Sequence, residues 1–232
     1  MSVLYLVPTP ICENTISKVL SKHVITVIHS LQQFVVEDIR TARRFLLQAG
    51  HPGPIEQLKF HLLNEHTSAA EIANILTFLR EEDTGVISEA GVPAVADPGA
   101  QVVKLAHANG ITVVPLVGPS SILMALMASG LNGQSFSFVG YLPAKRDECR
   151  KRLRILERRS ASERQTQIFI ETPYRNMQLL ENIMQCCSGD TMLAIAAGIT
   201  GADELIKTQS IRKWKLELPD LKKIPTVFLL QA

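Results

Sequence analysis

Gly85–Gly99 has the sequence GVISEAGVPAVADPG, in which an apolar run leads into a loop of glycine, alanine and proline. The run Gly85–Ser88 predicts a strand, and the helical pattern of Ala100–His107 stops at Asn109-Gly110, residues that favour a helix end. Ile111–Val114 predicts the next strand. A strand, a helix and a second strand in this order indicate a β-α-β unit, and therefore an α/β fold with a parallel sheet.

The loop inside Gly85–Gly99 is unusually long for a connection between a strand and a helix. It has about ten residues, where two to six are usual. Its small side chains let a ligand approach the backbone closely, and loops at the carboxyl ends of parallel strands are where open α/β sheets bind ligands. We predict a ligand site in this loop, with an ordinary βα connection as the competing interpretation.

Other apolar runs extend the pattern through the first half of the chain. Three further strands are expected, at Val3–Val7, His23–Ile28 and Leu58–Leu62. Between Val36 and Gly50, apolar residues recur at helical spacing, and Gly50 occupies the position of a C-cap glycine. A further helix is expected after Ser68, which forms an S-x-x-E capping box with Glu71.

The second half of the chain is expected to form a separate domain. A helix is expected from Ser120 to Ser129. The later elements are a strand at Phe136–Tyr141, a helix from Arg146, a strand at Gln167–Glu171, a helix that Pro173 opens at its first position, and strands at Met192–Ala196 and Thr226–Leu230. Consecutive strands predict a mixed second sheet. We place the boundary near Pro115–Pro119, between an N-terminal α/β domain over residues 1–116 and a C-terminal α/β domain over residues 117–232.

Composition is that of a soluble globular protein, with 46% apolar and 20% charged residues among 232. The net charge of +2 does not by itself require a nucleic-acid partner. The four cysteines lack metal-ligand spacing and the adjacent pair Cys186-Cys187 suits a reducing compartment. No window approaches the roughly 20 apolar residues of a membrane span. We expect a cytoplasmic protein with no membrane contact and no metal.

A second motif, Val117–Ser121, places two hydroxyls at the start of a helix. Free N–H groups at a helix N-terminus donate hydrogen bonds to polar or anionic groups of a ligand. A serine that only caps the helix would explain the same pattern. The chain contains no G-x-G-x-x-G, no GxxxxGK[ST] and no G-x-S-x-G. Their absence argues against a dinucleotide fold of that kind, a P-loop and a serine hydrolase.

Polar residues also follow two predicted strands. Glu37, Asp38 and Arg40 come after an apolar run, where they either face a substrate or cap the next helix. The segment Phe169–Arg175 offers the same two interpretations at the next such position. Both interpretations, contact with a ligand and capping of the next helix, remain open for each segment.

The run Lys145–Arg159 holds eight basic and three acidic residues. Cys149, Leu153 and Leu156 recur at helical spacing, so the run predicts an amphipathic helix with a basic outer face. Such a face either serves solvation or contacts the phosphates of RNA.

Six motifs, in this order, resemble the tetrapyrrole methylase superfamily, and within it the branch of small-subunit ribosomal RNA methyltransferases that modify a cytidine ribose 2′-hydroxyl. They are VPTPI (Val7–Ile11), VVEDIRTARRFL (Val35–Leu46), SEAGVPAVADPG (Ser88–Gly99), VVPLVGPSS (Val113–Ser121), FSFVGYLPAK (Phe136–Lys145) and IFIETPYR (Ile168–Arg175). The resemblance implies S-adenosylmethionine as cofactor, two α/β domains with a cofactor cleft between them, and a homodimer.

The resemblance also places the cofactor contacts by position. They fall on Pro8, Ser88, Glu89, Ala90, Gly91, Val92, Ala96, Asp97, Ser120, Ser121, Ile122, Glu171, Thr172, Ala197, Gly198, Pro225 and Thr226. Glu37, Asp38 and Arg40 are the candidate catalytic residues. A carboxylate that accepts a proton would help a ribose hydroxyl attack, with Glu89 as a further candidate, and Arg40 and Arg175 would orient an anionic group of the substrate.

Three departures from the ribosomal branch lie largely on the substrate side. Cys12-Glu13 replaces a Gly-Asn pair, Ile39 replaces the threonine of an EDTR motif, and Ala196–Thr200 replaces a charged R-E-L-T-K segment. Three functions are therefore compared: methylation of a ribosomal RNA ribose, which the branch favours, methylation of a small molecule such as a tetrapyrrole, and cofactor binding without catalysis.

Overall fold

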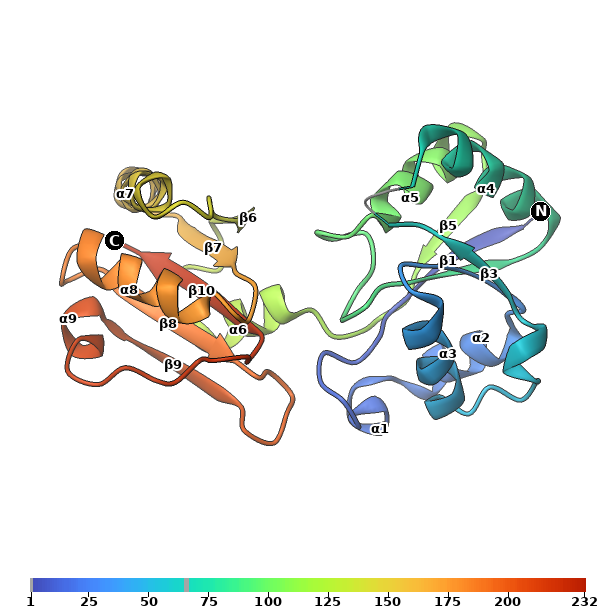
Figure 1. Cartoon of the computed structure of the whole chain (residues 1–232), viewed down its shortest axis with the longest axis horizontal. Coiled ribbons are helices and arrows are strands. Elements are labelled where there is room, and N and C mark those ends of the chain that lie inside the picture. The colour runs from blue at the N-terminus through green and yellow to red at the C-terminus, as the bar shows by residue number, and fades with distance from the viewer. Residues whose placement is uncertain (1, 65–66) are drawn as a thin grey trace. The chain divides into compact units, whose positions relative to one another are not determined.

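The computed structural model describes residues 2–64 and 67–232, and it divides into two compact units, Met1–Ser120 and Ser121–Ala232. Each unit has one five-stranded sheet with helices packed against it (Figure 1). The expected pair of α/β domains is confirmed, and each is described by itself below.

The N-terminal sheet is parallel throughout, as expected. Its strands are β1 (Val3–Val7), β2 (Gln33–Val36), β3 (Lys59–Leu62), β4 (Thr84–Ile87) and β5 (Thr112–Pro115), in the order β3-β2-β4-β1-β5. The helices are α1 (Ile16–Val19), α2 (Lys22–Ser30), α3 (Ile39–Gln48), the 3-10 helix η1 (Ile55–Gln57), α4 (Ala69–Glu81) and α5 (Gly99–Ala108). Ser68 and Glu71 form the predicted capping box of α4.

The alternating side chains of β2 separate two cores. Phe34 and Val36 pack with α2 and α3 on one face, whereas Val35 packs with α4 and α5 on the other. After β1 the chain continues into α1 and α2, which lie on the first face of the sheet. After the neighbouring strand β4 it continues into α5, which lies on the second face. In an open α/β sheet, such a divergence opens a crevice at the carboxyl ends of the two strands.

The strand predicted at His23–Ile28 is wrong, because these residues lie in α2. The side chain of Ser21 caps the helix by accepting the N–H of Val24, and Val24 and Ile28 are buried four residues apart. The β-branched composition favoured a strand, but this helical spacing of buried residues and the cap outweigh that propensity. The strand that follows β1 along the chain is β2.

The C-terminal sheet is mixed, as predicted. Its strands are β6 (Phe136–Tyr141), β7 (Thr166–Ile170), β8 (Met192–Ala197), β9 (Leu205–Ser210) and β10 (Thr226–Gln231), in the order β6-β7-β10-β8-β9. Only the pairing of β6 with β7 is parallel among these strands. The helices are α6 (Ser121–Ser129), α7 (Arg146–Glu163), α8 (Asn176–Cys186) and α9 (Ile211–Trp214).

Two cores lie on the two faces of this sheet. Leu153 of α7 and Leu180 of α8 pack with Phe228 on one face, and Ala125 of α6 packs with Val227 on the other. The helix after β7 begins at Asn176, so the prediction that Pro173 opens it is wrong. Residues 173–175 instead form a turn before the helix.

Candidate active site

The loops that follow β1 and β4 are joined to each other. The N–H of Thr9 donates to the carbonyl oxygen of Gly91 at 2.9 Å, and the N–H of Gly91 donates back to Thr9 at 3.1 Å. The hydroxyl of Ser88 also donates to Gly91 at 3.1 Å. Gly91 has a φ of 77°, and an added Cβ would lie 3.0 Å from the carbonyl oxygen of Pro119. Glycine is therefore required at this junction.

The remainder of the long loop has a strained backbone. Ala94 and Ala96 adopt φ values of 66° and 56°, a left-handed conformation that costs a residue with a Cβ about 1 kcal/mol or more. One carboxylate oxygen of Asp97 accepts the N–H groups of Ala94 at 2.9 Å and Gly99 at 2.7 Å. Asp97 thus holds the loop in this shape, and strained loops are common at ligand sites.

Glu37 is the first residue after β2, and its half-buried carboxyl group faces this loop. Burial raises the pKa of Glu37 to about 7, and a hydrogen bond with the Asp97 side chain and the charge of that carboxylate act in the same direction. A hydrogen bond with the backbone of Glu89 opposes the rise in pKa. A carboxyl group with a pKa near neutrality is suited to accept or release a proton at physiological pH.

Asp38 has a different environment from its neighbour. It is the N-cap of α3, where its carboxylate accepts the N–H of Thr41 at 2.8 Å, and this hydrogen bond lowers the pKa of Asp38. The hydroxyl of Thr41 donates to Glu89 at 2.6 Å. Capping, one of the two interpretations left open by the sequence, is therefore observed for Asp38. A catalytic role for Asp38 or the exposed Arg40 stays a prediction.

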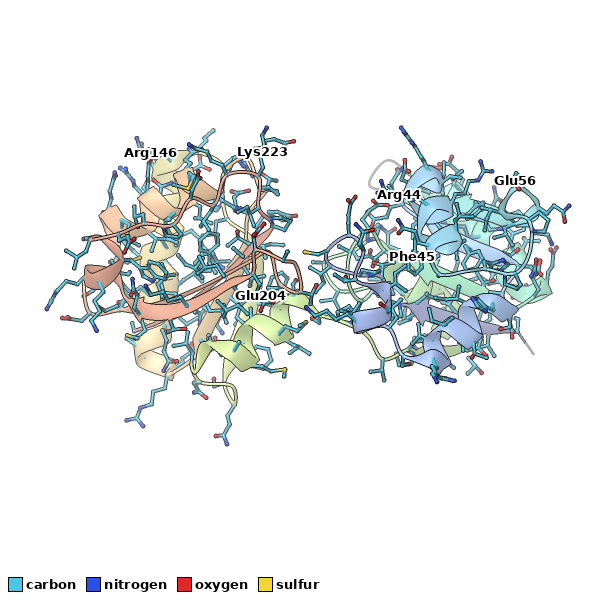
Figure 2. The ribbon with its side chains drawn as sticks, turned by 90° about the horizontal axis from the view of Figure 1, so that it is seen from below. Arg44, Phe45, Glu56, Arg146, Glu204 and Lys223 are labelled. Carbon is cyan, nitrogen blue, oxygen red and sulfur yellow. The ribbon has the colours of Figure 1, made fainter. Side chains whose placement is uncertain are left out.

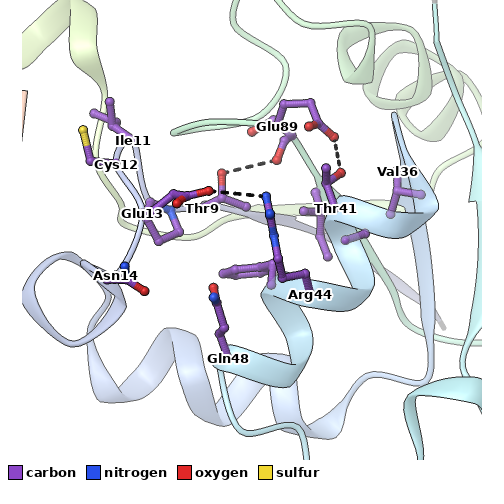
Figure 3. Close-up of a pocket in the computed structure, with 15 residues that line it drawn as sticks. Thr9, Ile11, Cys12, Glu13, Asn14, Val36, Thr41, Arg44, Gln48 and Glu89 are labelled. Carbon is purple, nitrogen blue, oxygen red and sulfur yellow. Dashed lines mark hydrogen bonds and ion pairs between the residues drawn. The ribbon is translucent and has the colours of Figure 1, made fainter. Parts of the chain in front are cut away.

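A cavity of about 240 Å³ lies beside these residues (Figure 3). One wall is the segment Thr9–Asn14 after β1, and another is α3, from which Thr41, Arg44 and Gln48 reach the cavity. The ends of β2 and β4 close it with Val36, Ile87, Ser88 and Glu89. Arg44 and Glu13 form an exposed ion pair at 3.7 Å across this region.

In the C-terminal domain, several predicted cofactor residues lie at the same end of three neighbouring strands, β7, β10 and β8. Because β10 is antiparallel to β7 and β8, its start lies beside their ends, and Thr226 pairs with Ala197. Glu171 follows β7 at the same end, with its carboxylate 2.6 Å from Arg175 and accepting the N–H of Thr172 at 2.6 Å. Gly198 has a φ of 59° and donates its N–H to Pro225 at 3.0 Å.

Ser120 and Ser121 lie where the sequence placed them, at the start of a helix. Ser121 is the first residue of α6, and Ile122, the second residue of the same helix, packs against the core of the C-terminal domain. Pro8, at the end of β1, contacts Gly118, which comes just before the serines. The predicted residues at the ends of β7 and β8 and at the start of β10 thus lie at the same end of the C-terminal sheet, and those of the loop after β4 lie together in the N-terminal domain.

Several residues of the site in the N-terminal domain were not predicted from the sequence. Thr9 lies within the recognised VPTPI motif, but only the structure shows its pairing with Gly91. Thr41, Arg44 and Gln48 follow one another at spacings of three and four residues, which places their side chains on one face of a helix. That spacing in the sequence could have indicated that these three side chains line a common surface.

The residues present fit S-adenosylmethionine. Ala90 is exposed and carries only a methyl group, and an added Cβ at Gly198 would lie 3.4 Å from the carbonyl oxygen of Asp203. The methyl group of Ala90 lets a ligand approach the backbone closely, whereas the glycine at 198 makes room for the chain's own backbone at Asp203. The strained loop held by Asp97 provides a second position for a ligand.

Comparison with known proteins identifies the family. The model of the Tetrapyrrole (Corrin/Porphyrin) Methylases matches residues 17–214. Ribosomal RNA small subunit methyltransferase I of Vibrio cholerae is 32% identical over 233 residues, covering 99% of this chain and 77% of that protein. The protein of the same name from Xylella fastidiosa is 32% identical over 203 residues, covering 88% and 70%.

Solved structures agree on the fold. The crystal structure of the methyltransferase CobJ matches 100% of this chain and 93% of its own with a TM-score of 0.63, at 18% identity. This similarity supports the fold of two α/β domains, and the family match together with the methyltransferase relatives supports the cofactor. The chain belongs to the tetrapyrrole methylase family, and it is an S-adenosylmethionine-dependent methyltransferase.

Proposed function

We propose that the chain methylates a ribose 2′-hydroxyl of small-subunit ribosomal RNA. The observation that carries the proposal is the 32% identity, over 99% of this chain, with ribosomal RNA small subunit methyltransferase I of Vibrio cholerae. The 2′-oxygen as acceptor rests on the resemblance of the six sequence motifs to the ribose-modifying branch.

Glu37 is the proposed general base. Bound S-adenosylmethionine supplies a methyl group that is activated by its positive sulfonium centre. A ribose hydroxyl is a poor nucleophile at neutral pH, so its proton must leave as the oxygen attacks. The carboxylate of Glu37, with a pKa of about 7, is available to take that proton, while the surrounding loops orient the reactants.

The direct test is methylation of small ribosomal subunits from a strain that lacks the gene, with labelled cofactor. Mass spectrometry of the nucleosides should show one added 2′-O-methylated nucleoside. Label found only in small-molecule fractions would favour the tetrapyrrole-type alternative. Cofactor binding without any methylated product would favour a catalytically silent module.

The C-terminal domain has a charge suited to RNA. Residues 121–232 hold 16 Lys and Arg against 11 Asp and Glu, whereas residues 1–120 hold 8 against 11. On α7, Arg146 lies at the start of the helix (Figure 2) and pairs with Glu181, and Arg159 pairs with Glu163. Lys151, Arg154 and Arg158 are exposed, lie on one face of α7 and have no recorded ion pair within residues 2–64 and 67–232. We propose that this stripe contacts RNA phosphates.

Replacing Lys151, Arg154 and Arg158 together with alanine should weaken binding to ribosomal RNA by roughly tenfold at 0.1 M salt, because three phosphate contacts are lost. The slope of log affinity against log salt should fall by about 2 to 3. A filter-binding titration at several salt concentrations measures both. The matched control removes Lys18, Lys22 and Lys104 from the N-terminal domain. An equal loss in that control would mean that net charge, and not the stripe, governs binding.

The predicted cofactor contacts are proposed as a set, and Ser121 tests them. Ser121→Tyr places a bulky ring at the first residue of α6 and should lower affinity for S-adenosylmethionine at least tenfold by calorimetry. Ala128→Tyr, at an exposed position near the other end of α6, is the control. Undiminished binding in the Ser121 variant would show that the proposed pocket is misplaced.

Two further proposals follow from the family resemblance. The protein is proposed to act as a homodimer in the cytoplasm, where small ribosomal subunits are modified. No helix in the described part of the chain is long and apolar enough to cross a membrane.

A further inference from the structure

Three of the four cysteines lie together where α7 packs against α8. Cys149 of α7 and Cys187, which follows α8, are buried in the core on this face of the sheet. Cys186, the last residue of α8, packs at the edge of that core and is the partly exposed member of the three. Its sulfur lies 3.8 Å from that of Cys187, within hydrogen-bonding distance. The proposed methyl transfer uses none of these thiols.

The hydrogen bond between the two sulfurs gives them different roles. It lowers the pKa of Cys186, whereas the same bond, together with burial, raises the pKa of Cys187. Cys187 therefore keeps its proton and donates to Cys186, which ionises first. The thiolate is the nucleophilic form of cysteine, and partial exposure gives a reagent access to this sulfur.

Other groups around Cys186 act in both directions. After the hydrogen bond from Cys187, burial raises the pKa of Cys186 and the positive charge of Arg154 lowers it. Glu157 raises this pKa and Arg150 lowers it by smaller amounts. The carboxyl end of α8 also disfavours a negative charge. The net shift is downward, so the Cys187 donor and the two arginines outweigh the opposing groups.

Arg150 is held beside the last turn of α8 by uncharged partners. Its Nε donates to Asn182 at 3.0 Å, and its Nη2 donates to Gln185, which directly precedes Cys186. Arg154 lies one helical turn further along α7 and is exposed. No ion pair of either arginine is recorded in the described part of the chain. Two uncompensated positive charges beside a thiolate attract a reagent that carries carboxylates.

We propose that Cys186 is a modification site, where its thiolate forms a mixed disulfide with a small-molecule disulfide that carries carboxylates. The Cys186 sulfur attacks one sulfur of the reagent and forms a new S–S bond, while the old S–S bond breaks and the other half leaves as a thiolate. Cys186 is oxidised and the reagent is reduced, so an excess of the corresponding thiol reverses the reaction. A bond to Cys187 would be strained, because adjacent Cα atoms are about 3.8 Å apart and disulfides usually span about 4.4–6.8 Å.

The modification also affects the stripe of Lys151, Arg154 and Arg158, and this consequence rests on the proposed RNA substrate. Arg154 belongs to the stripe and influences Cys186. Carboxylates attached to Cys186 would pair with Arg154 and compete with an RNA phosphate for it. Loss of one phosphate contact should weaken RNA binding roughly threefold at 0.1 M salt.

Glutathione disulfide is the probe, since both of its halves carry carboxylates. Treatment of the full chain at pH 7, followed by peptide mapping by mass spectrometry, should show an adduct that forms at least tenfold faster on Cys186 than on Cys12, the other partly exposed cysteine. Cys186→Ser should remove this adduct. Equal rates at Cys12 and Cys186, or a bond between Cys186 and Cys187 in place of the adduct, would overturn the proposal.

Arg154→Met tests the preference for carboxylates. Cystamine, a disulfide with two ammonium groups, is the reference reagent, because the ratio of the two rates cancels any change in the ionised fraction of Cys186. The rate with glutathione disulfide relative to cystamine should fall about threefold. Arg152→Met removes the same charge from an exposed position on a different face of α7 and should leave the ratio unchanged. An unchanged ratio in Arg154→Met would overturn the choice of a carboxylate-bearing reagent.

Filter binding to ribosomal RNA separates this proposal from the proposed function. The modified protein should bind about threefold less tightly than the reduced protein, and treatment with excess glutathione should restore binding. Cys186→Ser, treated in the same way, should bind as the reduced protein does. Equal binding of modified and reduced protein would overturn the link to the stripe. If neither form binds RNA, the proposed RNA substrate fails, while an adduct mapped to Cys186 still supports the modification site.

Discussion

Glu37→Gln is expected to lower kcat about 10²–10³-fold while leaving affinity for S-adenosylmethionine nearly unchanged. The loss is the usual contribution of a positioned general base. Glutamine has nearly the same shape but cannot take a proton from the ribose hydroxyl. Single-turnover methylation of small subunits, with calorimetric titration of the cofactor, separates the two effects.

The pH dependence tests the same role independently. Activity of the wild type should rise with pH through an inflection near 7, because the proton acceptor is the ionised form of Glu37. Asp97→Asn keeps the acceptor that holds Ala94 and Gly99 but removes the neighbouring charge that raises the pKa of Glu37. Its inflection should move to lower pH. A profile that is identical in the two proteins would exclude Glu37 as the titrating group.

Stability should respond with a defined sign. Because burial and Asp97 raise the pKa of Glu37 above its value of 4.5 in the unfolded chain, the folded state loses stability as pH rises from about 4.5 through 7. Solvent screening of this half-exposed group limits the effect to about 1 kcal/mol. Glu37→Gln should therefore melt at a higher temperature than the wild type at pH 8, and the difference should vanish near pH 4.

Asp38→Asn distinguishes the two acids that the sequence could not separate. Asparagine also caps helices well, so α3 should remain intact. If Asp38→Asn lowers kcat and Glu37→Gln does not, the base is Asp38 and the assignment from the raised pKa of Glu37 is wrong.

The sequence predicted the regular elements well where local signals agreed. Ser68 and Glu71 marked α4, and alternating strands and helices predicted the parallel sheet. The strand prediction for His23–Ile28 was wrong because a run of β-branched residues can form a helix when the helical spacing buries Val24 and Ile28. Local propensity does not include that tertiary packing.

The site was predictable only in part. The length of the loop after β4 indicated a ligand site, because connections of that length usually have a function. The neighbours of Glu37 and Asp38 could not be predicted, since adjacent residues leave a strand end in different directions. The proximity of Glu37 to Asp97, sixty residues away in the chain, depends on the order of β2 and β4 in the sheet.

Gly118→Ala is expected to produce the second large effect, on folding as well as on cofactor binding. An added Cβ at Gly118 would lie 2.1 Å from the Cβ and 2.4 Å from the Cγ of Pro8. Pro8 is buried and its ring is rigid, so it cannot rotate away. The backbone must therefore move, at a cost of about 1–3 kcal/mol for overpacking.

The displacement should reach the cofactor loops because of what lies next to this contact. Thr9 follows Pro8 and pairs with Gly91, and Ser120-Ser121 come shortly after Gly118. We expect affinity for S-adenosylmethionine to fall at least tenfold, and the melting temperature to fall by several degrees. Calorimetric titration and thermal unfolding measure the two losses.

Gly133→Ala is the matched control, because its added Cβ meets no atom within 4 Å. It should change neither quantity. Pro8→Gly combined with Gly118→Ala removes both atoms of the clash, so the double variant should recover more than the two single variants predict by addition. If Gly118→Ala behaves like Gly133→Ala, then the contact between Pro8 and Gly118 does not position the loops, and Ser120 and Ser121 must be held by other means.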